Sequence, residues 1–314
     1  MRPAIVAALL GLACASARAA GTFGPRGEKP FGVLLLGEGG DREWKDSVEK
    51  LKKELGKKFP FEFVPGLADA RMIQKGVERL EFQRVQKIVA VPLFVSSFSE
   101  VMDHNRFLFG IREKPAGPRY AHQRVSSRVP VVLAKALDDH PVLVEILSSR
   151  ALALAKDPSR ESLVLVGEVS GSTETARDWL ASAQALAEKV RGRTGFSAAH
   201  AAGLRLGGSQ KEREDSQKEL RDLVRKSRRQ GSVAVVPLEV THAAVSGRIP
   251  KALEGAFVRF DGKAILPDPA VARWVSESAE AAARLPDMRV FKDGAGGRRT
   301  LESPPPVRTR RGGY

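Results

Sequence analysis

The feature that most constrains this chain is a stretch that occurs twice, in which an apolar run leads through a Gly-Glu pair into an amphipathic helix. In the first copy, residues 31–55, the apolar run at 33–36 is continuous, as in a strand buried on both faces of a parallel sheet. Glycines then flank Glu38, and Trp44, Val48 and Leu51 recur at helical spacing behind Asp41, a candidate helix cap. Glu38 is therefore predicted at the carboxyl end of a buried strand, where open α/β sheets bind ligands.

The second copy spans residues 162–186. Its strand ends at Glu168, and small residues again lead into an amphipathic helix. A repeat of this length predicts an internal duplication that produces two similar lobes.

Alternating strand and helix patterns fill the rest of the chain. They predict an α/β fold with two similar lobes, each a doubly wound parallel sheet flanked by helices. The lobes are expected at 30–156 and 161–284, with a cleft between them and a disordered basic tail at 287–314. Residues 101–128 are charged and are expected to be irregular, and residues 264–266 are expected to form the last strand of the second lobe.

The first residues have the features of an export signal. Arg2 supplies the positive start, a short apolar core follows, and Ala17-Arg18-Ala19 is an A-x-A cleavage site, so residues 1–19 are predicted to be a signal peptide. The apolar core is too short to span a bilayer. We expect export to the periplasm or the medium, with lipoprotein anchoring at Cys14 as the less favoured alternative. Cleavage would leave a chain with no cysteine, hence no disulfide and no thiolate ligand.

The chain is strongly basic, with a formal charge of +15 over 314 residues and a pI near 10.2. Such a charge suits nucleic acid, an anionic membrane surface or an acidic small molecule, but a high-GC genome that encodes many arginines also explains it. Neither an RNA-binding aromatic-basic motif nor zinc-finger spacing is present, so no nucleic-acid partner is expected.

Three stretches of the first lobe resemble those of a known family, the sirohydrochlorin chelatases, which insert cobalt, nickel or iron into a tetrapyrrole. The strand and Gly-x-Gly turn around Glu38 resemble the family's opening motif. Residues 91–96, VPLFVS, look like its second motif, and residues 134–150, AKALDDHPVLVEILSSR, are similar to its His-Pro segment. The likeness is good over 31–156 and weak over 161–283, and it implies a divalent metal and a tetrapyrrole substrate or ligand.

The chain departs from the family at the two metal-site histidines, whose positions hold Glu38 and Glu100. The resemblance therefore implies that these two carboxylates ligate the metal and accept protons, with a preference for harder cations. If they lie close together, their repulsion should keep a proton on one of them. His104 and His140 are further candidate ligands, whereas Glu168 is interpreted as a remnant of the duplication.

Three functions remain open at the level of sequence. The chain can be an exported chelatase, that is, a metal lyase. It can be a non-catalytic exported protein that binds metal or tetrapyrrole. It can also be a degenerate pair of lobes whose basic tail contacts a partner or a membrane surface.

Overall fold

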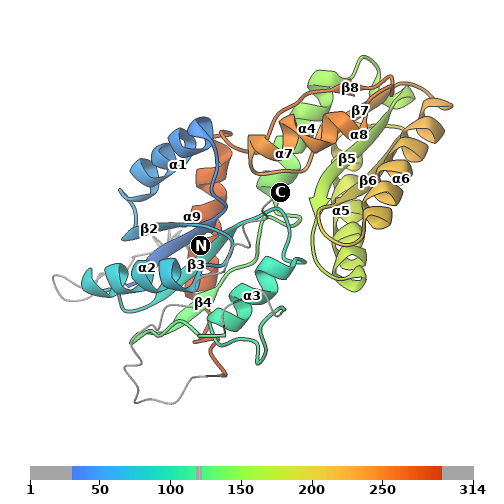
Figure 1. The fold of residues 1–314 in the computed structure, drawn as a ribbon. Helices are drawn as coiled ribbons and strands as arrows, with labels where there is room; N and C mark the ends of the chain where they lie inside the picture. The colour runs from blue at the N-terminus through green and yellow to red at the C-terminus, as the bar shows by residue number, and fades with distance from the viewer. Residues whose placement is uncertain (1–29, 118–119, 121, 292–314) are drawn as a thin grey trace, which may run out of the picture.

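The computed structural model describes residues 30–117, 120 and 122–291, which form two α/β lobes (Figure 1). Each lobe contains a four-stranded parallel sheet, and the strand order is the same in both, β2-β1-β3-β4 and β6-β5-β7-β8. The predicted fold class is thereby confirmed, while an origin by duplication stays a prediction. The predicted signal peptide and Cys14 lie outside the described residues.

The strands of the first lobe are β1 (Gly32–Gly37), β2 (Phe61–Pro65), β3 (Ile88–Leu93) and β4 (Val131–Leu133). Those of the second lobe are β5 (Ser162–Val169), β6 (Ala198–Arg205), β7 (Val233–Pro237) and β8 (Arg259–Phe260). The central strands β1, β3 and β7 are buried along their whole length, as expected for parallel strands covered by helices on both faces.

The long helices are α1 (Arg42–Leu55), α2 (Ala70–Phe82), α4 (Pro141–Leu154), α5 (Thr173–Thr194), α6 (Gln210–Arg228) and α9 (Ala270–Ala283). The shorter ones are α3 (Glu100–Leu108), α7 (His242–Ser246), α8 (Arg248–Ala252) and the 3₁₀ turn η1 (Pro158–Arg160). None of the helices in the described part of the chain is long and apolar enough to cross a membrane.

The two faces of each sheet carry alternate residues of the same strand. In β1, Val33 and Leu35 belong to the apolar cluster that includes α1 and α9, whereas Leu34 and Leu36 pack with α2 and α3. In β5, Leu163 and Leu165 face α4 and α5, and the intervening valines face α6 and α8. This alternation follows from the two-residue repeat of a strand.

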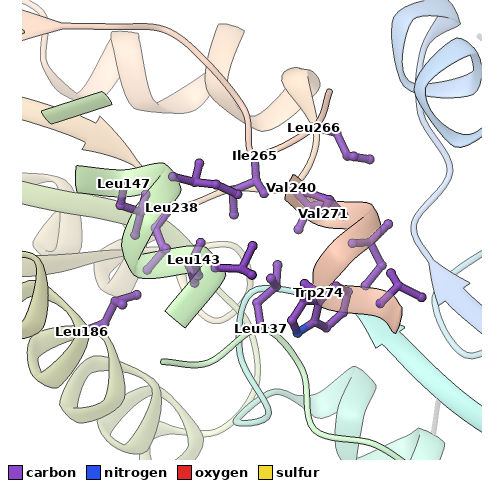
Figure 2. Close-up of a cluster of buried hydrophobic side chains, with 14 of the residues drawn as sticks. Leu137, Leu143, Leu147, Leu186, Leu238, Val240, Ile265, Leu266, Val271 and Trp274 are labelled. Atoms are coloured by element: carbon purple, nitrogen blue, oxygen red, sulfur yellow. The ribbon is translucent and has the colours of Figure 1, made fainter. Parts of the chain in front are cut away.

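The two lobes exchange helices. The helix α4 follows the first sheet in sequence but packs against α5 and β7 of the second lobe, and α9 follows the second sheet but packs against β3 and α1 of the first. Figure 1 shows α9 (orange-red) among the elements of the first lobe and α4 (green) beside the second. Figure 2 shows the shared apolar cluster, where Leu143 of α4 and Trp274 of α9 meet between the lobes.

Residues 101–128 are not irregular throughout, because α3 occupies their first third. Ser99 caps this helix by accepting a hydrogen bond from the Met102 amide at 3.2 Å. Met102, Phe107 and Leu108 form its buried face. Asp103 and Arg106, two of the charges that suggested a loop, instead pair with each other on this helix at 2.7 Å.

The last strand of the second lobe also differs from the expectation. It is β8, which pairs with β7, and not residues 264–266. The latter segment runs beside the chain that follows β7, with the Ile265 amide donating to the Glu239 carbonyl at 2.7 Å. The apolar pattern of residues 264–266 thus reflects burial and not membership of the sheet.

The start of the predicted tail also folds. Within residues 287–291, the Met288 amide donates to the Val131 carbonyl at 3.1 Å, and the Phe291 amide donates to the Gly110 carbonyl at 2.9 Å. Residues 287–291 therefore lie against the first lobe, and the rest of the predicted tail lies outside the described residues.

We predict that the exchanged helix α9 is needed for the stability of the whole protein. Trp274→Ala removes a fully buried side chain from the cluster that joins the lobes, so it should lower the free energy of unfolding by about 3–5 kcal/mol. Phe82→Ala, at a side chain 89% exposed, is the control and should change this energy by less than about 0.5 kcal/mol. Equilibrium denaturation measures both, and equal effects would contradict this role of α9.

Candidate functional site at the carboxyl edge of the sheets

Glu38 lies where the sequence places it, directly after β1 and before α1. Asp41 fixes this turn by accepting a hydrogen bond from the Trp44 amide at 2.9 Å. The Glu38 side chain is partly buried, and this burial raises the pKa of its carboxyl above the ordinary value. A carboxyl that has lost much of its hydration and lies at the carboxyl edge of a sheet is a candidate functional group.

Glu168, the counterpart of Glu38 in the second lobe, stands near the end of β5. Its side chain is only 8% exposed and pairs with Arg248 of α8 at 2.8 Å, while the Arg248 side chain is 61% exposed. Burial raises the pKa of Glu168, the Arg248 charge lowers it, and the charge of Glu38 raises it. The last effect indicates that the two equivalent glutamates, one from each lobe, interact electrostatically.

Glu239 follows β7 and completes this group. Its carboxylate accepts a hydrogen bond from the Glu168 backbone amide. The pKa of Glu239 is raised well above its ordinary value, and burial is the largest cause. The negative charges of Glu168 and Glu38 raise this pKa further, whereas the hydrogen bond from the Glu168 amide and the positive charge of Arg248 lower it. We call Glu38, Glu168 and Glu239 the carboxylate cluster. One of its members therefore keeps a proton to a higher pH than an ordinary carboxyl does.

Glu100 lies on the same cleft but beside a different part of the second lobe. It is the first residue of α3, and its Cγ atom would lie 3.5 Å from a Cβ placed on Gly171. Gly171 has a φ of +102° in the turn between β5 and α5, a conformation that favours glycine. Of the two predicted carboxylates, Glu38 thus lies with the carboxylate cluster and Glu100 lies next to Gly171.

His104 is buried in the first lobe as part of an aromatic stack. Its ring lies 4.3 Å from the Tyr120 ring and 5.5 Å from the Phe107 ring, measured between centroids, and neither ring nitrogen has a hydrogen-bond partner among the described residues. Burial, and then the charge of His122, lower its pKa to about 4. The imidazole is therefore neutral under most conditions and serves packing in this structure.

His140 is the N-terminal cap of α4. Its Nδ1 atom accepts a hydrogen bond from the Val142 amide at 3.3 Å, and its Nε2 atom lies 3.6 Å from a carboxylate oxygen of Glu277 in α9. Burial lowers its pKa, whereas Glu277 raises it. His140 thereby links the two exchanged helices.

The carboxylates do not form a finished metal cage. Within residues 30–117, 120 and 122–291, no group of three or more His, Cys, Asp or Glu side chains is arranged to hold a metal ion.

A cavity of about 570 Å³ lies between the lobes, next to the loop that leads into Glu100. Apolar side chains such as Phe98 and Met102 line it together with the cations Arg106 and Lys135 and the acids Asp138 and Asp139. Its second-lobe wall comes from α5, including Asp178. This size and mixture are typical of a site for an organic ligand.

Sequence reasoning did not find Glu239, and it interpreted Glu168 as a remnant. The signal for Glu168 was available, because the repeat aligns it with Glu38. Glu239 had no such signal, because its counterpart after β3 is the apolar Phe94.

Comparison with known proteins gives a family match over the first part of the chain and matches to solved structures over most of it. Residues 32–154 match the CbiX family model. SirB from Bacillus subtilis with Fe³⁺ superposes with a TM-score of 0.58 at 14% identity, covering 82% of this chain and 96% of SirB. The cobalt complex of the sirohydrochlorin chelatase SirB from Bacillus subtilis subspecies spizizenii gives 0.56 at 12% identity, with 84% and 100% covered.

DR2241 from Deinococcus radiodurans, a multi-domain protein with structural similarity to chelatases, gives a TM-score of 0.50 at 17% identity. The match covers 82% of this chain and 56% of DR2241. No curated protein matches the sequence. The first part of the chain thus matches the CbiX family, and the fold of the two lobes together is that of the sirohydrochlorin chelatase structures.

Proposed function

We propose that this protein is a chelatase that binds a divalent cation at the carboxyl edge of its sheets and inserts it into a tetrapyrrole held between the lobes. The observation that carries the proposal is the carboxylate cluster. Its three carboxylates come from the ends of β1, β5 and β7, the edge where open α/β sheets bind ligands, and they interact electrostatically with one another. Bringing buried carboxylates together costs free energy unless a cation or a proton compensates for their charge.

In this proposal Glu38 and Glu100 take the roles that the resemblance assigns to two histidines. Glu38 ligates the cation together with Glu168, and Glu100 reaches the tetrapyrrole from the other side of the cleft. A carboxylate is both an anionic ligand and a base, so these groups can accept the two protons that leave the pyrrole nitrogens. Oxygen ligands favour harder cations such as Mn²⁺ over Ni²⁺.

The absence of a three-ligand cage among the described residues suits a metal that must be passed on. Two carboxylates and water hold a cation loosely, and a substrate metal has to leave its site in every cycle. The 570 Å³ cavity offers an apolar wall for the macrocycle, and Lys135 can pair with one of its acid side chains.

The second candidate is a non-catalytic exported protein that binds metal or tetrapyrrole on the same fold. The contacts of the two histidines favour it, since His104 packs in an aromatic stack and His140 caps α4. Only carboxylates then remain for the metal, and cobalt and nickel, which imidazole suits, would bind weakly. Export, which the first residues predict, fits this role because the ordinary precursors are made in the cytoplasm.

We predict that the carboxylate cluster makes the stability of the protein depend on pH. Because the pKa of Glu239 is raised in the folded state, folding takes up a proton, and the free energy of unfolding should fall as the pH rises above the ordinary value of 4.5. Glu239→Gln removes this titration and retains an oxygen that can accept the Glu168 amide hydrogen bond. Denaturation between pH 5 and 8, a range of about three units, should show a shallower fall for the variant.

The control for this experiment is Glu254→Gln, at an exposed glutamate of the second lobe. It should retain the slope of the parent protein. If the free energy of unfolding fell with pH as steeply in Glu239→Gln as in the control, the electrostatic interaction within the cluster would be contradicted.

We predict weak, pH-dependent metal binding. Calorimetric titration with Mn²⁺, Co²⁺, Ni²⁺ and Zn²⁺ should give dissociation constants on the order of 10⁻⁴ M, with Mn²⁺ favoured over Ni²⁺ relative to an imidazole site. Affinity should rise with pH, because the cation displaces the proton of the cluster. In the double variant Glu38→Gln, Glu100→Gln the affinity should fall at least about tenfold.

The double variant Glu78→Gln, Glu254→Gln has the same change in net charge at exposed positions and is the matched control. Equal losses in both double variants would mean that the metal responds only to overall charge. If the parent protein bound none of these metals, the metal-binding role in both candidate functions would be refuted.

A chelatase assay separates the two candidates. The parent protein, supplied with a cation that it binds and with sirohydrochlorin, should increase the rate of metal insertion, followed by the change in the absorption spectrum. Glu100→Gln should reduce this rate about 10²-fold, as expected for loss of a positioned base, and leave the fold intact. Binding of metal or sirohydrochlorin without any rate increase would refute the catalytic proposal and support the binding protein.

A further inference from the structure

The opposite edge of the second lobe collects positive charge. Crossover helices run antiparallel to the strands that they connect, so α6 ends where β5 and β7 begin, away from the carboxylate cluster. The turn after α6 lies directly against η1, because a Cβ placed on Gly231 would lie 1.9 Å from the Arg160 carbonyl oxygen. This close approach brings the end of α6 and Arg160 to one edge.

We call the exposed residues of this edge the basic edge: Arg160, Lys226, Arg228, Arg229 and Phe257. None of its four cations forms an ion pair within the described residues. The acids of α6 end with Asp222, which already pairs with Arg225 at 2.5 Å. The acids of the neighbouring turns are Asp157, Glu254 and Glu161, and Glu161 is buried and pairs with Arg259, so positive charge predominates at the surface.

Cations at the end of a helix have an ordinary role, which is to balance the negative end of its dipole. This role accounts for Lys226 and Arg228 in the last turn of α6. It does not account for Arg160, which lies outside α6, nor for the exposed aromatic ring between the helices and β8.

Phe257 is 78% exposed, and the guanidinium carbon of Arg228 lies 5.0 Å from the centre of its ring. A large exposed apolar side chain costs free energy in water, although a single one is common on protein surfaces. Its contact with Arg228, at the edge that also carries Arg160, Lys226 and Arg229, is the informative feature. An exposed aromatic ring beside lysines and arginines is the combination that binds the interface of an anionic bilayer.

We propose that the basic edge docks the protein on an anionic phospholipid surface, with Phe257 inserted among the headgroups. The four cations meet the negative surface, and the ring enters the boundary between headgroups and acyl chains. The carboxylate cluster then faces away from the membrane, so the cleft between the lobes stays open to the solvent. The proposal does not depend on the proposed metal or tetrapyrrole chemistry.

The edge suits a bilayer better than a single-stranded nucleic acid. Nucleic-acid surfaces of this kind use several aromatic side chains on which successive bases stack. The basic edge has one such ring, already covered on one side by Arg228.

Sedimentation with lipid vesicles tests the proposal on the full chain. Vesicles of phosphatidylcholine alone are compared with vesicles that contain about one third phosphatidylglycerol. The parent protein should bind only the anionic vesicles, and less as salt is added. Arg228→Gln with Arg229→Gln should weaken binding about 25-fold, near fivefold for each charge removed, and Phe257→Ser should weaken it about tenfold.

The matched control is Lys211→Gln with Arg213→Gln, which removes the same charge at the other end of α6. This variant should bind vesicles like the parent protein, and thermal unfolding checks that all variants fold. The arginines of residues 292–314 are present in every variant, so binding through them would persist when the basic edge is changed.

Three outcomes would overturn the proposal. The first is equal binding by the parent protein and the Arg228, Arg229 variant, which would assign binding to another part of the chain. The second is equal binding to neutral and anionic vesicles. The third is that polyuridylate binds the parent protein more tightly than the vesicles do, and that the same variants lose this binding. That result would make the edge a nucleic-acid surface.

Discussion

Burial of the two exchanged helices is the interaction on which the rest of the structure depends. Each sheet needs helices on both faces, and each lobe obtains one of them from the other half of the chain. The apolar cluster around Leu143 and Trp274 therefore belongs to both lobes (Figure 2). Because neither lobe completes its core alone, the cleft between them has a defined geometry, and residues far apart in sequence can act on one another across it.

Charge at that cleft follows from the same geometry. Strands β1, β5 and β7 all end at it, and a glutamate follows or ends each of them, so the fold itself brings like charges together. Burial raises the pKa of each of these carboxyls, and their mutual repulsion raises the pKa values of Glu168 and Glu239 further. The positive charge of Arg248 offsets part of this repulsion through its ion pair with Glu168. A site of this kind is poised to exchange a proton for a cation, which is the chemistry that metal insertion requires.

The sequence predicts the strands and long helices of this fold well, because continuous apolar runs and helical spacing are local signals. The repeat around Glu38 and Glu168 was sufficient to predict two similar sheets. The helix exchange had no local signal, since the apolar face of α9 does not specify which sheet it covers. The helix α3 was missed because Asp103 and Arg106, which pair at 2.7 Å, resemble the charges of a loop.

The site was predictable only where the resemblance supplied a position. Glu38 and Glu100 came from the family's histidines, and both lie on the cleft, but no pattern in the sequence indicated that Glu239 would lie beside Glu168. That neighbour relation arises from the pairing of β5 with β7, a contact between residues about seventy positions apart. The same pairing places the ends of the helices, and hence the basic edge, on the far side of the sheet. Parallel topology thus places the carboxylate cluster and the basic edge at opposite edges of the sheet, so a protein held by one edge can use the other.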